Sequence, residues 1–418
     1  MADGHTEQGA AAAVDEGRLW GRLMALAAVG ARPDGGVDRP ALSMQDAQAR
    51  SLVAGWARDL GFAVATDPIG NLFVRRAGRD PDAAPVLTGS HLDTQPMGGR
   101  FDGAYGVIAG LEALHAMNDA GISTRRPVEL VAWTNEEGAR FQPGCMGSAV
   151  FTGALALETA LAAVDRDGMT AREALAAVLA GEPEMAIRPA DAAVHAYVEA
   201  HIEQGPVLEE EGLPLGIVTG IQGCRWFAVE VTGEAAHAGT TPRARRRDAF
   251  MAAHAIVAEL RRALEDEADV TRFTIGRFEV EPGSPNTVPA RVFFTIDLRH
   301  PDAARLTDLG DRVAPLAGSA AGGCAVTVTQ TSASAPVVFA DPVLRVLRDA
   351  AVRCGVPFRD LPSGAGHDAG YLAAMAPTGM LFVPCAGGVS HHPAESAAPA
   401  DLATGARVLA EGLVRLAE

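Results

Sequence analysis

The segment Thr88-Gly-Ser-His91-Leu-Asp93-Thr-Gln-Pro-Met-Gly-Gly-Arg-Phe-Asp102 connects an apolar run to a helical pattern through a polar, glycine-rich turn. Residues 84–88, which lead into this segment, predict a short buried strand. Side chains two apart in a strand face the same way, so His91 and Asp93 are expected to project together where the strand ends. That arrangement suits a metal-bound imidazole whose other nitrogen is held by a carboxylate.

Ordinary structural roles are open for the same residues. A single His-x-Asp pair is more often a structural ion pair than part of a metal site. Asp102 precedes a predicted helix and would also serve as its N-cap. This segment alone does not decide between these interpretations.

Three further apolar runs end in residues of the same kind. Adjacent carboxylates repel, so a pair at the end of a buried strand needs a cation or a shared proton. Open α/β sheets place their ligands beyond the carboxyl ends of strands, which predicts one metal site made from all four strand ends. The runs are 128–134, followed by Asn135-Glu136-Glu137; 196–200, followed by His201; and 379–383, followed by Cys385 and then His391-His392.

Seven blocks spread over nearly the whole chain carry this pattern: Gly89-Ser-His-Leu-Asp-Thr, Phe101-Asp-Gly, Thr134-Asn-Glu-Glu-Gly-Ala-Arg-Phe141, His201-Ile-Glu-Gln-Gly-Pro, Ala236-His-Ala-Gly-Thr-Thr-Pro242, Ser363-Gly-Ala-Gly-His-Asp-Ala369 and Ser390-His-His-Pro-Ala-Glu395. In kind and order they resemble the M20 family of dinuclear metallo-amidohydrolases. Within it they resemble the hydantoinase/carbamoylase branch, which comprises N-carbamoyl-L-amino acid hydrolases, β-ureidopropionases and allantoate amidohydrolases.

The resemblance implies two divalent metal ions per chain. Asp102 would bridge them, with His91 and His201 completing one site and Glu137 and His391 the other. His392 stands beside His391, and the family pattern points to the first of the two. Nitrogen and oxygen ligands without thiolate fit Zn²⁺ or Mn²⁺, are compatible with Co²⁺ or Ni²⁺, and do not choose among them.

The resemblance also implies the catalytic residues. Glu136 would be the general base, which takes a proton from water and later protonates the leaving nitrogen. His237 would donate to the tetrahedral oxyanion, although a histidine in a loop of small residues is more commonly a solvated surface residue. Asp93 is counted with the catalytic residues because its carboxylate is expected to orient the imidazole of His91.

Four residues match the family's substrate contacts: Gln204, Asn286, Arg299 and His367. Asn286 and Arg299 correspond to a carboxylate clamp, for which the bidentate fork of arginine is suited. Without the resemblance, Arg299 would be read as an ordinary salt bridge at a strand end. Arg243 follows Thr-Thr-Pro where relatives commonly have an apolar residue, which leaves open an altered substrate preference or only a poor helix start.

Bulk composition restricts the class of protein. A chain of 418 residues with 48% hydrophobic and 21% charged residues is typical of a globular protein with two domains. The net charge of −17 argues against nucleic acid or an anionic membrane as partner. The basic side chains are arginine and none is lysine, so a lysine nucleophile or Schiff base is excluded. The five cysteines are scattered without a Cys-x-x-Cys pair, and Cys145 and Cys385 are interpreted as packing residues.

Neither a signal-peptide pattern at the first residues nor an apolar run of about 18 residues occurs. We therefore expect a cytoplasmic location.

The pattern predicts an α/β fold: a large α/β metal-binding catalytic domain with an inserted ferredoxin-like α+β lid and dimerisation domain. The expected boundaries are 1–221 and 335–418 for the catalytic domain and 222–334 for the lid. Within the lid, a strand at 226–231, a helix at 245–264, strands at 272–280 and 291–299, a helix at 302–317 and a strand at 324–331 give the β-α-β-β-α-β order.

The expected function is hydrolysis of the N-carbamoyl (ureido) group of N-carbamoyl-L-amino acids to amino acid, CO₂ and ammonia, by a homodimer joined through the lid domain. The expected partner is a small ureido acid. An allantoate or ureidoglycolate amidohydrolase or a β-ureidopropionase is the main alternative. A peptidase or deacylase is disfavoured by His201 and by the Asn286/Arg299 pair. A non-catalytic binding protein is expected to have lost Glu136 or a ligand.

Overall fold

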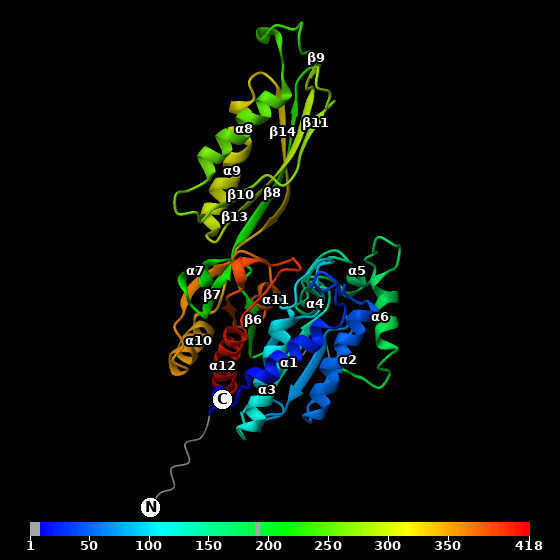
Figure 1. Ribbon diagram of the computed structural model, residues 1–418, viewed down its shortest axis with the longest axis vertical. Coiled ribbons are helices and arrows are strands. Elements are labelled where there is room, and N and C mark those ends of the chain that lie inside the picture. Colours follow the sequence, from blue (N-terminus) through cyan, green and yellow to red (C-terminus); the bar gives the residue numbers. More distant parts are fainter. Residues whose placement is uncertain (1–8, 189–192) are drawn as a thin grey trace, which may run out of the picture. The chain divides into compact units, whose positions relative to one another are not determined.

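The computed structural model describes residues 9–188 and 193–418. The chain divides into two compact units, coloured along the sequence in Figure 1. The large unit combines the residues up to 219 with residues 338–418, and the small unit comprises residues 220–337. The small unit is therefore an insertion in the sequence of the large one.

Four parallel strands form the centre of the large unit. They are β3 (Val86–His91), β4 (Val128–Trp133), β6 (Ala196–Ile202) and β17 (Thr378–Val383), adjacent in the order β17-β6-β3-β4. Every residue of these strands is buried, which explains why they read as continuous apolar runs rather than as alternating patterns. Their carboxyl ends lie at one edge of the sheet.

The remaining strands extend this sheet on both sides. On the β4 side, β2 (Leu72–Arg76) and β1 (Ala63–Thr66) follow in antiparallel pairing, and on the β17 side β7 (Gly216–Ile221) is antiparallel to β17. Three short strands complete the ten-stranded sheet: β5 (Ala186–Ile187), β15 (Val337–Val338) and β16 (Arg359–Ser363).

Helix α3 (Ala104–Asp119) packs closely on the central strands, because it presents glycine to them. A Cβ at Gly106 would lie 2.3 Å from the carbonyl oxygen of Ala200 in β6. This close approach brings the start of α3 beside the ends of β3 and β6. The large unit's other helices are η1 (Ala10–Ala13), α1 (Glu16–Ala27), α2 (Met44–Asp59), α4 (Met146–Phe151), α5 (Leu157–Leu161), α6 (Ala171–Leu179), α7 (Val207–Glu211), α10 (Asp341–Arg353), α11 (Asp368–Leu372), η3 (Ala386–Gly388) and α12 (Pro399–Leu416).

The small unit has the predicted β-α-β-β-α-β order. Its antiparallel sheet runs β10 (Arg272–Thr274), β13 (Arg291–His300), β8 (Gly223–Thr232) and β14 (Ala325–Ser334), with β11 (Phe278–Glu281) also paired to β13. Helices α8 (Ala249–Leu264) and α9 (Ala303–Ala320) lie together on one face, as Figure 1 shows, and bury the apolar core of this unit. The expected α/β class with a ferredoxin-like insertion is confirmed.

Two details of the small unit differ from the expectation. Helix α8 begins at Ala249 rather than at residue 245, because the Asp248 side chain caps it by accepting from the main-chain nitrogens of Phe250 and Met251. The turn before it is the short helix η2 (Arg243–Arg245). The strand expected at 272–280 is divided into β10 and β11, with Gly276 between them.

None of the described helices combines the length and the apolar character that a bilayer-spanning helix requires.

Replacing Gly89 with alanine should strongly destabilise the large unit. A Cβ there would lie 1.8 Å from the carbonyl oxygen of Val131, in the neighbouring strand, where the backbone cannot yield. We expect a loss of about 3 kcal/mol or more in the free energy of unfolding, measured by urea denaturation. Gly55→Ala is the matched control, because its Cβ would meet nothing within 4 Å in helix α2 and should stabilise by up to about 1 kcal/mol. Equal behaviour of the two variants would contradict this account.

Candidate metal centre

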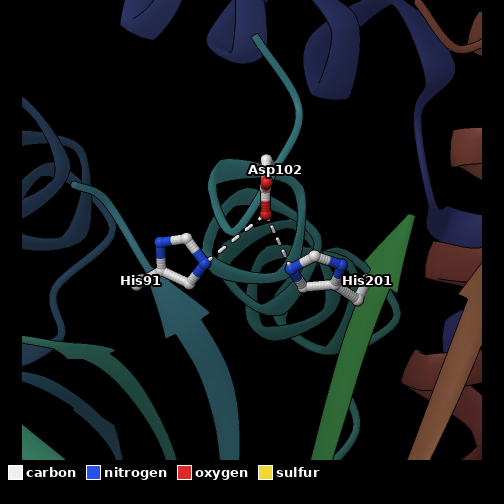
Figure 2. A group of neighbouring side chains, drawn as sticks. All are labelled: His91, Asp102 and His201. Atoms are coloured by element: carbon white, nitrogen blue, oxygen red, sulfur yellow. Dashed lines mark ion pairs between the residues drawn. The ribbon is translucent and has the colours of Figure 1, made fainter. Parts of the chain in front are cut away.

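Three side chains meet where β3 and β6 end and α3 begins. Figure 2 shows the rings of His91 and His201 directed at the carboxylate of Asp102. The Nε2 atoms of His201 and His91 lie 3.2 Å and 3.6 Å from Oδ1 of Asp102. All three residues are buried. The strand ends therefore converge as predicted.

The other oxygen of Asp102 belongs to a second group. Nε2 of His391 lies 3.2 Å from Oδ2 of Asp102 and 3.3 Å from Oε2 of Glu137. In each group the possible ligand atoms lie within 4.8 Å of one another, so both groups have the dimensions of a metal site and share Asp102. His392 is exposed and is in neither group; its Nδ1 accepts from the main-chain nitrogen of Ala394.

The two buried imidazoles are held in the tautomer that metal ligation requires. Nδ1 of His91 lies 2.9 Å from the carbonyl oxygen of Asp93, and Nδ1 of His201 lies 2.9 Å from that of Ile202. Because a carbonyl only accepts, each Nδ1 carries the hydrogen and each Nε2 presents its lone pair. Gly103 also donates its main-chain N–H to Nε2 of His201, at 3.1 Å.

The expected role of the Asp93 carboxylate needs correction. Its Oδ1 lies 3.9 Å from Nδ1 of His91, beyond hydrogen-bond range, and the main-chain oxygen of Asp93 makes the contact instead. The carboxylate accepts from the main-chain nitrogens of Glu136 and Glu137, each at 3.2 Å. Asp93 therefore fixes the backbone that carries the two glutamates, which the spacing of residues on one strand could not reveal.

The electrostatics of the centre call for a cation. Burial raises the pKa of Glu137, and the nearby charge of Asp102 raises it further. Although burial opposes it, the neighbouring imidazoles of His201, His391 and His91 hold the pKa of Asp102 well below its usual range. A divalent ion would supply the positive charge that these buried carboxylates require. The donor set of imidazole nitrogens and carboxylate oxygens fits such an ion.

Glu136 lies beside the two groups and is a member of neither. Its Oε2 is 3.5 Å from Nε2 of His91. Burial raises the pKa of Glu136 well above its usual value, despite the opposing effect of His91. The thiol of Cys145 donates to Oε1 of Glu136 at 3.3 Å, so Cys145 contacts a site residue and is more than the packing residue expected.

Two residues to which the sequence pattern gave no role, the buried Glu395 and the half-buried Ser390, support Asp102. The carboxylate of Glu395 accepts from the main-chain nitrogens of Phe101 and Asp102, at 2.7 Å and 3.1 Å, and burial raises its pKa to about 7. The hydroxyl of Ser390 lies 3.0 Å from both Asp102 and Glu395. A signal for them was present, since both stand in the last of the seven blocks, Ser390–Glu395, but their contacts with Asp102 span almost 300 residues of chain.

The carboxylate of Glu137 is held from the other side of the centre. Gln95 donates both its main-chain nitrogen and its side-chain nitrogen to this carboxylate, at 3.1 Å and 2.8 Å. Gln95 lies in the segment between His91 and Asp102, and its position beside Pro96 gave no indication of this contact.

Two of the expected substrate residues lie against the centre. The amide nitrogen of Gln204 donates to Oδ2 of Asp102 at 3.0 Å, and its Oε1 is buried without a partner among the described residues. His367 is buried, with its ring centroid 4.7 Å from that of His201 and its Nε2 2.9 Å from the hydroxyl of Ser363. Both are brought together with the ligands.

The other expected residues lie in the small unit. His237 ends the two-residue strand β9 (Ala236–His237), which pairs with β12 (Thr287–Val288), so that Asn286 lies next to the partner of His237. Arg299 forms an ion pair with Asp297 at 2.8 Å, which is the structural role that sequence analysis weighed against a clamp.

Replacing Asp102 with alanine should abolish divalent-ion binding in both groups, because the variant removes a ligand from each. Metal content after dialysis, measured by mass spectrometry, checks this. Asp34→Ala is a matched control on the surface, where the carboxylate pairs with Arg32 and accepts from the main-chain nitrogen of Gly36, away from both groups. One tightly retained ion per Asp102→Ala chain would contradict the sharing of Asp102.

Comparison with known proteins places these features in a family. Residues 87–415 match the model of peptidase family M20/M25/M40. The chain is 43% identical to the N-carbamoyl-L-amino acid amidohydrolase of Geobacillus stearothermophilus, over 96% of this chain and 98% of that one. It is 40% identical to the N-carbamoyl-L-amino-acid amidohydrolase of Rhizobium meliloti, over 97% of each chain.

A solved structure agrees with these relatives. The structure of an amidase of the hydantoinase/carbamoylase family from Burkholderia multivorans superposes with a TM-score of 0.91 and 47% identity, covering 97% of this chain and 98% of that one. The family model spans well over half of the chain and the identity extends over nearly all of it. The chain therefore belongs to peptidase family M20/M25/M40, in its hydantoinase/carbamoylase branch.

Proposed function

We propose that this protein is a metal-dependent amidohydrolase that removes the N-carbamoyl group of N-carbamoyl-L-amino acids, giving the amino acid, CO₂ and ammonia. One observation carries the proposal: two potential ligand groups share Asp102, and a further carboxylate, that of Glu136, lies largely buried beside them and outside both groups. A centre of that kind has both a place for cations and a base to move protons. The similarity to N-carbamoyl-amino acid amidohydrolases supports the substrate class.

We propose that the centre holds two divalent ions. His91, Asp102 and His201 would hold one, and Asp102, Glu137 and His391 the other; Zn²⁺ or Mn²⁺ suits these ligands, and Co²⁺ or Ni²⁺ is compatible with them. A ureido carbonyl is a poor electrophile because both nitrogens donate into it, and bound ions would supply Lewis-acid polarisation and acidify the attacking water.

Glu136 is proposed as the general base. Burial raises its pKa, which brings the carboxylate toward the range in which it can accept a proton from water and later release it to the leaving nitrogen. The Asp93 carboxylate fixes its backbone and the Cys145 thiol contacts its side chain, so the base is held in one orientation. Such positioning is worth much in catalysis, since it avoids reorganisation during the reaction.

His237 is proposed as the oxyanion donor. Its Nδ1 accepts from the main-chain nitrogens of Gly239 and Thr240, at 3.0 Å and 3.2 Å. The hydrogen of the neutral ring is therefore on Nε2, where it can be donated to an oxygen that develops negative charge. Asn286 and Arg299 are proposed to bind the substrate carboxylate, Arg299 with its guanidinium oriented by Asp297. Gln204 and His367 are proposed as further substrate contacts.

We propose a homodimer joined through the small unit, the lid and dimerisation domain expected at 222–334. Strand β14 is an edge of the small sheet, is ten residues long and has no charged residue. Exposed edges of that kind are normally blunted by charge or proline or covered by a partner. In the dimer, His237 of one chain is proposed to serve the centre of the other. A cytoplasmic location stays a prediction.

An assay of ammonia release tests the function. Several N-carbamoyl-L-amino acids, allantoate, ureidoglycolate and N-carbamoyl-β-alanine should be compared, and the first group should give the highest kcat/KM. Glu136→Gln should retain its metal but lose about 10³-fold or more in kcat, because the amide cannot accept the proton. Preference for allantoate would establish the alternative amidohydrolase. Loss of metal from Glu136→Gln would show that Glu136 and not only Glu137 is a ligand.

Complementation between two inactive variants tests the shared site. His237→Ala lacks the oxyanion donor and Glu136→Gln lacks the base. When the two are unfolded and refolded together, about half of the dimers should be mixed, and each mixed dimer should contain one complete site. Activity should then return to a sizeable fraction of the wild-type value. If mixing recovers no activity while mixed dimers are present, His237 acts within its own chain.

A further inference from the structure

The loop that follows His237 is fastened by a single arginine. Arg246 donates its Nε to the carbonyl oxygen of Thr241 at 2.9 Å and its Nη2 to that of Ala238 at 2.6 Å. Its side chain is half-buried, unlike those of the neighbouring arginines. Both acceptors lie in the loop 238–241, so the planar guanidinium joins the two ends of that loop.

The other contacts of the loop converge on His237. The main-chain nitrogen of Ala238 donates to the carbonyl oxygen of Asn286 at 3.0 Å, and the main-chain nitrogen of Thr241 donates to that of His237 at 3.1 Å. The same turn presents the nitrogens of Gly239 and Thr240 to Nδ1 of His237. The loop therefore determines both the orientation of the ring and the nitrogen that carries its hydrogen.

We propose that Arg246 is a positioning residue for His237: by holding the carbonyls of Ala238 and Thr241 it keeps the loop in the conformation that places the hydrogen on Nε2. Arg246 does not touch the reacting atoms. It acts through the imidazole, and it also supports the backbone of Asn286 through Ala238. This inference rests on the proposed function, in which His237 is the oxyanion donor.

A general effect of positive charge is the competing explanation, because four arginines stand in 243–247. Arg245 separates the two explanations. Its side chain is exposed and has no hydrogen-bond or ion-pair partner among the described residues, although it stands next to Arg246 in a chain of net charge −17. Arg245→Ala removes the same charge from the same segment and leaves the loop carbonyls held.

Steady-state kinetics of Arg246→Ala, Arg246→Lys and Arg245→Ala test the proposal. Arg246→Ala should lower kcat by about 10- to 100-fold, part of the 10²- to 10³-fold that loss of an oxyanion donor costs. Arg246→Lys should fall between it and wild type, since an ammonium lacks the fork that spans two carbonyls. Arg245→Ala should stay within about twofold of wild type. Equal losses in Arg246→Ala and Arg245→Ala would overturn the proposal in favour of charge alone.

Chemical rescue distinguishes positioning from damage to the fold. Guanidinium ion at millimolar, non-denaturing concentration should restore part of the kcat of Arg246→Ala, because it can occupy the vacated place between the two carbonyls. It should not restore His237→Ala, which lacks the donor itself. No rescue of Arg246→Ala, or equal rescue of both variants, would overturn the proposal.

A spectroscopic measurement tests the positioning of His237 by Arg246 without any substrate. The measurement uses nuclear magnetic resonance of protein labelled with ¹⁵N in histidine. Because the chain has 11 histidines, the spectrum of His237→Asn is needed to assign the resonance of His237. Wild type should show His237 with its hydrogen on Nε2, and Arg246→Ala should show a mixture of tautomers. An unchanged tautomer would overturn the inference. If the wild-type protein is inactive toward all ureido substrates but the tautomer of His237 still depends on Arg246, the proposed function is overturned. The positioning of His237 by Arg246 would stand in that case.

Discussion

The architecture of the centre depends on the placement of one carboxylate, that of Asp102. Its two oxygens face imidazoles from three different segments: Oδ1 faces His91 and His201, and Oδ2 faces His391. Such sharing requires the Asp102 carboxylate to be held in one position and orientation. The main-chain contacts of Glu395 and the glycine at position 103 provide this, since a Cβ at Gly103 would lie 2.3 Å from the His91 ring.

The cost of this arrangement falls on the surrounding carboxyl groups. Glu136, Glu137, Glu395 and Asp93 are all within the buried centre, and burial raises the pKa of each. Negative charge concentrated in this way destabilises the fold unless cations neutralise it. The same burial raises the pKa of Glu136, so the feature that destabilises the centre without cations also suits Glu136 to its proposed role as a proton carrier.

The two units hold their expected site residues in place by different means. In the large unit, the candidate ligands lie at or after the ends of buried parallel strands, where the packed sheet fixes them. In the small unit, His237 stands in an exposed loop whose order comes from main-chain contacts and from the guanidinium of Arg246. A loop of that kind depends on a few directional hydrogen bonds, so single substitutions outside the reacting groups should affect it more than they would affect the strand ends.

The sequence by itself determined the fold class, the four buried strands and the histidines and carboxylates at their ends, because hydrophobic periodicity and the change of polarity at a strand end are local properties. It also placed the ferredoxin-like insertion, through the order of its elements. Only the tertiary structure decided which atoms meet. It gave the Nδ1 contact of His91 to a carbonyl instead of the Asp93 carboxylate, paired Arg299 with Asp297, and brought Glu395, Ser390 and Cys145 into the centre. The contacts of Glu395 and Ser390 with Asp102 join residues almost 300 positions apart, which no local pattern connects. The contacts of His91 and Arg299 are local in sequence, but they depend on side-chain directions that only the packed chain defines.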